Sequence, residues 1–142
     1  MAHRKTATLR WTGDDWNFET TLGSGYTVQF KAPNADTAGG SPMEFMLAGV
    51  AGCTAVDVVS ILKKMRQDVQ DLTVFIDGDR AEDYPMVYTD VKIVYTVKGK
   101  DIDPTAVEKA IELSMTKYCS ASITFKRAGV HVTTEYVIEE AA

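Results

Sequence analysis

Apolar residues alternate with polar ones in some segments of the chain and follow helical spacing in others. Each such segment predicts a strand or a helix. Short alternating runs predict three strands near the N-terminus, at residues 6–11, 17–21 and 26–31, followed by a loop at 33–40. Longer alternating runs predict later strands, at residues 69–81, 86–98, 123–126 and 130–138. Helical spacing predicts two helices, at residues 42–65 and 104–118. With the last two strand segments counted as one, the order β-β-β-α-β-β-α-β is typical of an α+β fold.

The first helix has a well-marked start and almost no polar face. Ser41, Pro42 and Glu44 combine an N-cap serine, a proline at the first helical position and a glutamate at N3, which is a capping box. Gly49 and Gly52 within the helix predict the close approach of another backbone, that of a second helix. Because this helix is apolar nearly all round, we expect it to be buried on most faces, by a homodimer.

Length and composition bound the class of protein. The 142 residues are enough for one domain with one core, spanning residues 1–142. A net charge of −5 argues against nucleic-acid binding. Residues 1–20 hold no apolar stretch typical of a signal peptide. The longest apolar run of the first helix is about 12 residues, short of the ~18–20 that cross a membrane. We therefore expect a cytoplasmic protein without a membrane segment.

Two cysteines, Cys53 in the first helix and Cys119 after the second, are the candidate chemical groups. Without a secretory signal a permanent disulfide is not expected, so these thiols are either small buried side chains or a redox pair. The spacing of His3 and His131 from the cysteines predicts no metal site, and a cysteine hydrolase would need His131 as its base. No glycine-rich phosphate loop is present, so we expect no cofactor.

Two motifs resemble a known family. The run GGSPMEFMLAGVAGCTAVDVVSILKKMR, followed much later by KYCSAS before a final strand, resembles the OsmC/Ohr family over essentially the whole chain. Within that family the sequence is more similar to the YhfA-like OsmC proteins than to the organic hydroperoxide resistance (Ohr) enzymes. The resemblance implies an intertwined homodimer, in which two central cysteine-bearing helices are wrapped by antiparallel sheets.

The resemblance also implies an activity and its residues. It implies a thiol peroxidase of oxidative-stress defence that reduces organic hydroperoxides and is restored by a dithiol reductant. Cys53 would attack the peroxide as a thiolate and become a sulfenic acid, and Cys119 would condense with it to a disulfide. Glu44 would be the carboxylate that accompanies the thiolate.

The sequence departs from the family pattern at two charged positions. The family glutamate directly follows the proline, where this chain has Met43, and the carboxylate falls on Glu44 instead. At about 100° per residue, Glu44 lies roughly 180° around the helix from Cys53, and the capping box already gives it a structural role. The family arginine has no counterpart in its loop. The possible substitutes are Arg10, Lys31 and Arg127.

Two alternatives to the peroxidase remain open. In the first, a catalytically silent OsmC-like dimer binds a small apolar ligand at the subunit interface, with Met43, Phe45 and Met46 lining the pocket. In the second, the dimer is purely structural and its thiols are inert. Alkylation of Cys53 in the native protein would distinguish a reactive thiol from an inert one.

Overall fold

The computed structural model describes residues 3–34 and 38–142, so residues 35–37 of the expected loop lie outside the described part. The elements in chain order are β1 (Ala7–Trp11), β2 (Phe18–Leu22), β3 (Thr27–Phe30), α1 (Pro42–Lys64), β4 (Asp68–Arg80), β5 (Tyr88–Lys100), α2 (Pro104–Leu113), the π-helix η1 (Ser114–Tyr118), α3 (Ser120–Arg127) and β6 (His131–Glu140). The chain divides into two compact units, Met1–Met46 and Leu47–Ala142, and each is described separately.

The first unit holds the three expected N-terminal strands. β1, β2 and β3 form an antiparallel sheet in that order, with Phe18 opposite both Trp11 and Phe30. Gly13 turns the chain between β1 and β2 with a φ of 105°, a conformation that a residue without a Cβ adopts readily. Phe45 packs on Phe30 with ring centroids 4.8 Å apart, which fixes the start of α1 within this unit.

The ends of α1 follow the rules of helix capping. Ser41 Oγ accepts from the Glu44 N–H at 3.2 Å, and Glu44 Oε1 accepts from the Ser41 N–H at 3.0 Å, which confirms the capping box. Arg66 takes a left-handed conformation with φ of 60°, and the Gln67 N–H reaches back to the Leu62 carbonyl at 3.0 Å. This is the pattern of a Schellman stop, so the helix ends within a residue of the prediction.

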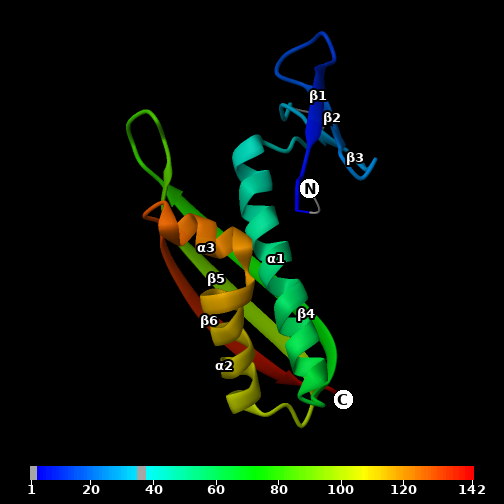
Figure 1. Ribbon diagram of the computed structural model, residues 1–142, viewed down its shortest axis with the longest axis vertical. Helices are drawn as coiled ribbons and strands as arrows, with labels where there is room; N and C mark the ends of the chain where they lie inside the picture. Colours follow the sequence, from blue (N-terminus) through cyan, green and yellow to red (C-terminus); the bar gives the residue numbers. More distant parts are fainter. Residues whose placement is uncertain (1–2, 35–37) are drawn as a thin grey trace. The chain divides into compact units, whose positions relative to one another are not determined.

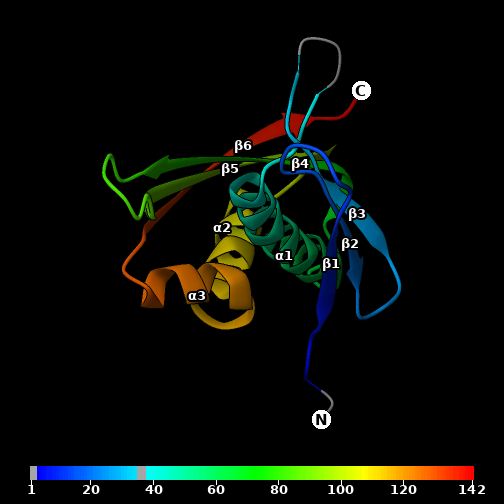
Figure 2. The ribbon, with the colours of Figure 1, turned by 90° about the horizontal axis from the view of Figure 1, so that it is seen from above.

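A mixed three-stranded sheet in the order β4-β5-β6 forms the base of the second unit. β4 pairs with β5 antiparallel, whereas β6 pairs with β5 in parallel, so the expectation of antiparallel sheets is wrong for this pair. Parallel neighbours need a crossover connection, and α2, η1 and α3 supply it. Within the second unit, these helices and α1 lie on one face of the sheet (Figures 1 and 2).

The core of the second unit lies between β5 and the helices. From Val91 to Val97, every second residue of β5 is fully buried: Val91, Ile93, Tyr95 and Val97. This alternation is what a strand with one covered face requires. From α1, the buried residues form one stripe with four-residue spacing: Val50, Thr54, Val58 and Leu62.

The remaining faces of α1 are not buried within one chain, and their expected burial by a second copy stays a prediction. Val56 is 67% exposed, and a Cβ on Gly49 or Gly52 would meet no atom within 4 Å in the described residues. By length and a mean hydropathy of 2.0 alone, α1 could cross a membrane, although core helices of soluble proteins pass the same test. Its buried stripe gives it a packed role inside the second unit.

The segment at 123–126 was expected as a strand and is part of α3 instead. The alternation of Ile123 and Phe125 with polar neighbours mimics a strand, but the structure buries Ser122 and Phe125, three residues apart as on a helix face. Gly129, with φ of 97°, ends the helix, and the Val130 N–H bonds to the Phe125 carbonyl at 3.0 Å. The strand β6 then follows close to its expected position.

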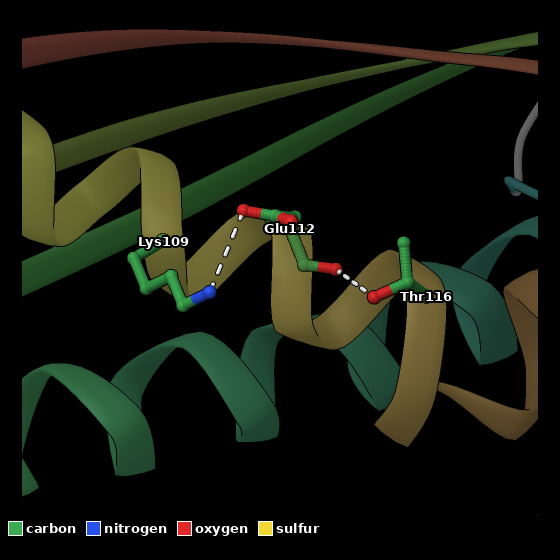
Figure 3. A network of polar contacts seen from close by, with 3 residues as sticks. All are labelled: Lys109, Glu112 and Thr116. Carbon is green, nitrogen blue, oxygen red and sulfur yellow. Dashed lines mark hydrogen bonds and ion pairs between the residues drawn. The ribbon is translucent and has the colours of Figure 1, made fainter.

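The second helix begins as expected but changes form in its last turn. Asp103 caps α2 by accepting from the Thr105 N–H at 3.0 Å. After Leu113 the chain continues as the π-helix η1. There the Thr116 hydroxyl donates to the Glu112 carbonyl at 2.7 Å, and the Glu112 carboxylate lies 3.8 Å from the Lys109 ammonium (Figure 3). That ion pair is exposed and contributes little to stability.

Candidate functional site

The fold of the second unit brings the two cysteines together, although they are far apart in the sequence. Cys53 lies in the middle of α1 and is half-buried, whereas Cys119 is fully buried. Both are free thiols, and Cys53 Sγ lies 4.0 Å from the hydroxyl of Ser120, the residue after Cys119, so Cys53 is close enough to affect the pKa of Cys119. Cys119 directly follows the π-helix η1, at the end of the second helical segment. It lies at the junction of η1 and α3, in extended conformation, as the N-cap of α3.

The position of Cys119 sets the electrostatics of its thiol. Burial is the largest cause and raises the pKa of Cys119. The hydrogen bond and the charge of Cys53 raise it further, whereas bonds from Ser122 oppose the rise. One of these bonds runs from the Ser122 N–H to Cys119 Sγ at 3.4 Å. A buried thiol whose pKa is raised stays protonated at neutral pH.

Cys53 Sγ has a hydroxyl neighbour in the part of the chain that the structure describes. The Ser120 hydroxyl lies 4.0 Å from Cys53 Sγ. No lysine or arginine among the described residues hydrogen-bonds either sulfur. Arg127 is the last residue of α3, at the opposite end of that helix from Cys119, and it belongs to a helix rather than to a strand. Arg10 and Lys31 belong to the first unit.

Glu44 belongs to the first unit, where its carboxylate bonds to the start of α1. The backbone N–H of Ser41 is the main cause that lowers the pKa of Glu44, and the Ser41 hydroxyl adds to it. A carboxylate held in this way stabilises the first turn of the helix, as a capping box does. Its structural role is therefore observed, and a catalytic role for Glu44 stays a prediction.

Beside the cysteines lies a buried polar network that the sequence reasoning missed. Thr54, the residue after Cys53, bonds to both Tyr95 and Ser114 at 2.7 Å. Ser114 also donates to Asp57 at 2.9 Å. A signal for this network was present, because each of its three hydroxyl residues occupies a position that the periodicity of its element assigns to the core. Polar residues at core positions of neighbouring elements indicate a shared hydrogen-bond network.

Among the described residues, no group of three histidine, cysteine or acidic side chains could hold a metal ion. His131, the candidate base of a cysteine hydrolase, begins β6 opposite Asp90 on β5 and is exposed.

Comparison with known proteins identifies the family of the chain. A family model described as "OsmC-like protein" matches residues 34–135, which is well over half of the sequence. The chain belongs to the OsmC-like family. The matched segment includes α1, both cysteines and all of the second unit except its last residues.

Individual relatives agree with this assignment. The chain is 39% identical to protein YhfA of Escherichia coli over 115 residues, or 81% of this chain and 84% of that protein. The fold is similar to an OsmC-like protein from Mycoplasma pneumoniae, with a TM-score of 0.82 at 12% identity over 97% of this chain and 99% of that one. It is also similar to the organic hydroperoxide resistance protein OhrB of Bacillus subtilis, with a TM-score of 0.65 at 18% identity over 96% of this chain and 100% of that one. These two structures support the α+β fold.

Proposed function

We propose that this protein is a thiol-dependent peroxidase that reduces organic hydroperoxides through Cys53 and Cys119. The observation that carries the proposal is the proximity of the two thiols inside a single unit: Cys53 Sγ lies 4.0 Å from the hydroxyl of Ser120, the residue after Cys119. One thiol is half-buried and the other is fully buried. The name of the similar OhrB protein, an organic hydroperoxide resistance protein, supports the same class of substrate. A role in oxidative-stress defence, in a reducing cytoplasm, follows from this activity.

The proposed reaction has three steps. The Cys53 thiolate attacks the peroxide O–O bond, so the sulfur becomes a sulfenic acid and the peroxide leaves as an alcohol after taking up a proton. The sulfur of Cys119 then attacks the sulfur of Cys53 and forms the disulfide. The hydroxyl of the sulfenic acid leaves as water, with the proton that Cys119 gives up. An external dithiol finally exchanges with this disulfide, restores both thiols and becomes a disulfide itself.

The surroundings of the two sulfurs support this division of roles. Cys53 is the more exposed of the two and so the more accessible to a peroxide. Cys119 is fully buried beside it, in the place that a resolving thiol needs, and burial raises the pKa of Cys119. Such a thiol reacts with its partner sulfur in preference to a peroxide in solution.

A direct experiment mixes the reduced protein with cumene hydroperoxide and counts free thiols with time. We expect the wild type to lose two thiols per peroxide and to form the Cys53–Cys119 disulfide. Cys119→Ser should stop at a sulfenic acid that dimedone traps, and Cys53→Ser should consume no peroxide. Unchanged thiols in the wild type, or equal loss in Cys53→Ser, would reject the peroxidase and favour the silent ligand-binding or structural dimer.

We also propose that the protein is a homodimer in which a second copy covers the exposed face of α1. This face carries small or apolar side chains with about four-residue spacing: Ala48, Gly52, Val56 and Ser60. Beside it, residues of α1 and β4 line an open groove of about 560 Å³. Small side chains allow the close approach of another helix, and exposed apolar surface of this kind favours a protein partner.

A further inference from the structure

A chain of four polar side chains connects three elements of the second unit beside the thiols. We call it the hydroxyl chain, and its members are Asp57 and Thr54 on α1, Ser114 on η1 and Tyr95 on β5. The three hydroxyl residues are fully buried or nearly so. The bonds Asp57–Ser114, Ser114–Thr54 and Thr54–Tyr95 measure 2.9, 2.7 and 2.7 Å.

The protons of the hydroxyl chain have one consistent arrangement. Ser114 donates its proton to Asp57, so its oxygen is left to accept from Thr54. Thr54 in turn accepts from Tyr95, because each hydroxyl carries one proton. Burial is the main cause that raises the pKa of Tyr95 to about 12, so Tyr95 remains a donor at any physiological pH. Every member therefore has its partner, and such a fully satisfied network is rigid.

The hydroxyl chain is joined directly to the segments that carry both thiols. Thr54 follows Cys53 in α1, and Asp57 lies one turn later on the same helix. On the other side, the Ser114 carbonyl accepts from the Cys119 N–H at 2.8 Å. Ser114 is thus the residue through which α1 holds the backbone of Cys119.

The segment between Ser114 and Cys119 is a π-helix. A π-helix is rare and occurs mostly as a single turn inserted into an α-helix, frequently at a functional site. Lys126 of α3 donates to the Met115 carbonyl at 2.9 Å, and the Thr116 hydroxyl donates to the Glu112 carbonyl. Together with Ser114, these residues hold the five-residue turn that delivers Cys119 to Cys53.

We propose that Ser114, through the hydroxyl chain, is the positioning residue that holds Cys119 against Cys53 for disulfide formation. The inference rests on the proposed function, which gives the disulfide its purpose. An apolar set of similar volume would fill the same core without three buried hydroxyl groups that need partners. What the hydroxyl chain adds is a fixed register between α1 and η1, and hence between the two sulfurs.

The test measures the effective concentration of the two thiols, and it requires no peroxide. Wild-type protein and variants are equilibrated with mixtures of reduced and oxidised glutathione, and the fraction of the Cys53–Cys119 disulfide is read by mass spectrometry. Ser114→Ala and Thr54→Val each break the link between α1 and η1, so we expect about a tenfold lower effective concentration. Thr54→Ser keeps the hydroxyl, so its effective concentration should be close to that of the wild type.

Tyr95→Phe is the matched control. It also removes a buried hydroxyl but leaves Asp57, Ser114 and Thr54 connected, so its effective concentration should stay near the wild-type value while its stability to urea falls. The positioning role would be overturned if the effective concentration fell in proportion to the stability to urea across all the variants. It would also be overturned if Ser114→Ala and Thr54→Val kept the wild-type effective concentration. A wild type that forms the disulfide yet consumes no peroxide overturns only the proposed function. Absence of the disulfide in the wild type overturns both.

Discussion

At the scale of single residues, the two cysteines differ in a way that suits two different chemical roles. Cys53 is half-buried, with the Ser120 hydroxyl 4.0 Å from its sulfur. Cys119 is fully buried, and its pKa is raised chiefly by burial. That cause remains when Cys53 is oxidised, whereas the charge of Cys53 disappears with the formation of a neutral sulfenic acid. Disulfide formation should therefore be limited by the ionisation of Cys119.

This difference predicts the pH dependence of disulfide formation. The reactive species is the Cys119 thiolate, and a raised pKa means that less of it exists at a given pH than for an ordinary cysteine. Below the pKa of Cys119, the rate at which the sulfenic acid is converted to the disulfide should rise about tenfold per pH unit. It should level off only above pH 9.0, the ordinary pKa of a cysteine. Quenched-flow trapping of the Cys53 sulfenic acid with dimedone measures this rate.

The control for this prediction is Cys119→Ser resolved by an added small thiol, whose ionisation is unperturbed. Its rate should level off at the ordinary pKa of that thiol. A wild-type rate that levels off at the same pH or below would show that burial does not govern the ionisation of Cys119. It would also remove the electrostatic reason for assigning the resolving role to this residue.

The sequence predicted the two cysteines but not their immediate neighbours, and the reason is physical. Cys53 and Cys119 were identifiable because their motifs are local. The contact of Cys53 with Ser120 and the backbone bond of Cys119 to Ser114 depend on the π-helix between Ser114 and Cys119, which no local pattern indicates. Thr54 and Ser114 stand at core positions of their helices, so their pairing could be expected only once the two helices were placed side by side.

At the scale of elements, predictions succeeded where capping or alternation was strong. The start of α1 is set by Ser41 and Glu44, whose two bonds are local and need no tertiary contact. The failure at 123–126 has the opposite cause. A short alternating segment fits a strand or a helix equally well, and the crossover that joins β5 to the parallel strand β6 decides in favour of the helix.

The capping box makes a prediction about the ionisation of Glu44. The pKa of Glu44 is lowered mainly by the Ser41 backbone N–H and secondly by its hydroxyl. Because Ser41→Ala keeps the backbone donor and removes the hydroxyl, it should raise this pKa part of the way toward 4.5. Carbon-13 NMR titration of the Glu44 carboxyl measures the change, with Ser24→Ala, in a turn of the same unit, as the control.

The ionisation of Glu44 also makes the stability of the first turn of α1 depend on pH. A carboxylate whose folded pKa is lowered contributes stability that is complete above its unfolded pKa and is lost as the pH falls through the folded value. The loss for Glu44 should therefore begin below the ordinary value of 4.5. An unchanged Glu44 pKa in Ser41→Ala would show that the hydroxyl plays no part in holding the carboxylate.

At the scale of the whole molecule, the exposed apolar face of α1 has the clearest consequence. Only one stripe of α1 is buried within the chain, while Val56 on another face is 67% exposed. Val56 and Val59 of α1, with Val69 and Leu72 of β4, line the open groove described above. A helix of this composition is stable in water only if something covers that face. A second copy with the same exposed face meets this need by symmetry.

A charge placed on this face should therefore separate the copies. Val56→Asp would put an unpaired carboxylate into the proposed interface, and we expect it to raise the dissociation constant about a hundredfold or more. Val137→Asp is the control. Val137 is also a large apolar residue, 50% exposed, but it belongs to the strand β6 and not to the proposed interface on α1. Sedimentation equilibrium should give twice the chain mass for the wild type and the control, and a monomer for Val56→Asp at micromolar concentration. A monomeric wild type, or a dimer that Val56→Asp leaves intact, would mean that this face of α1 meets something other than its own copy.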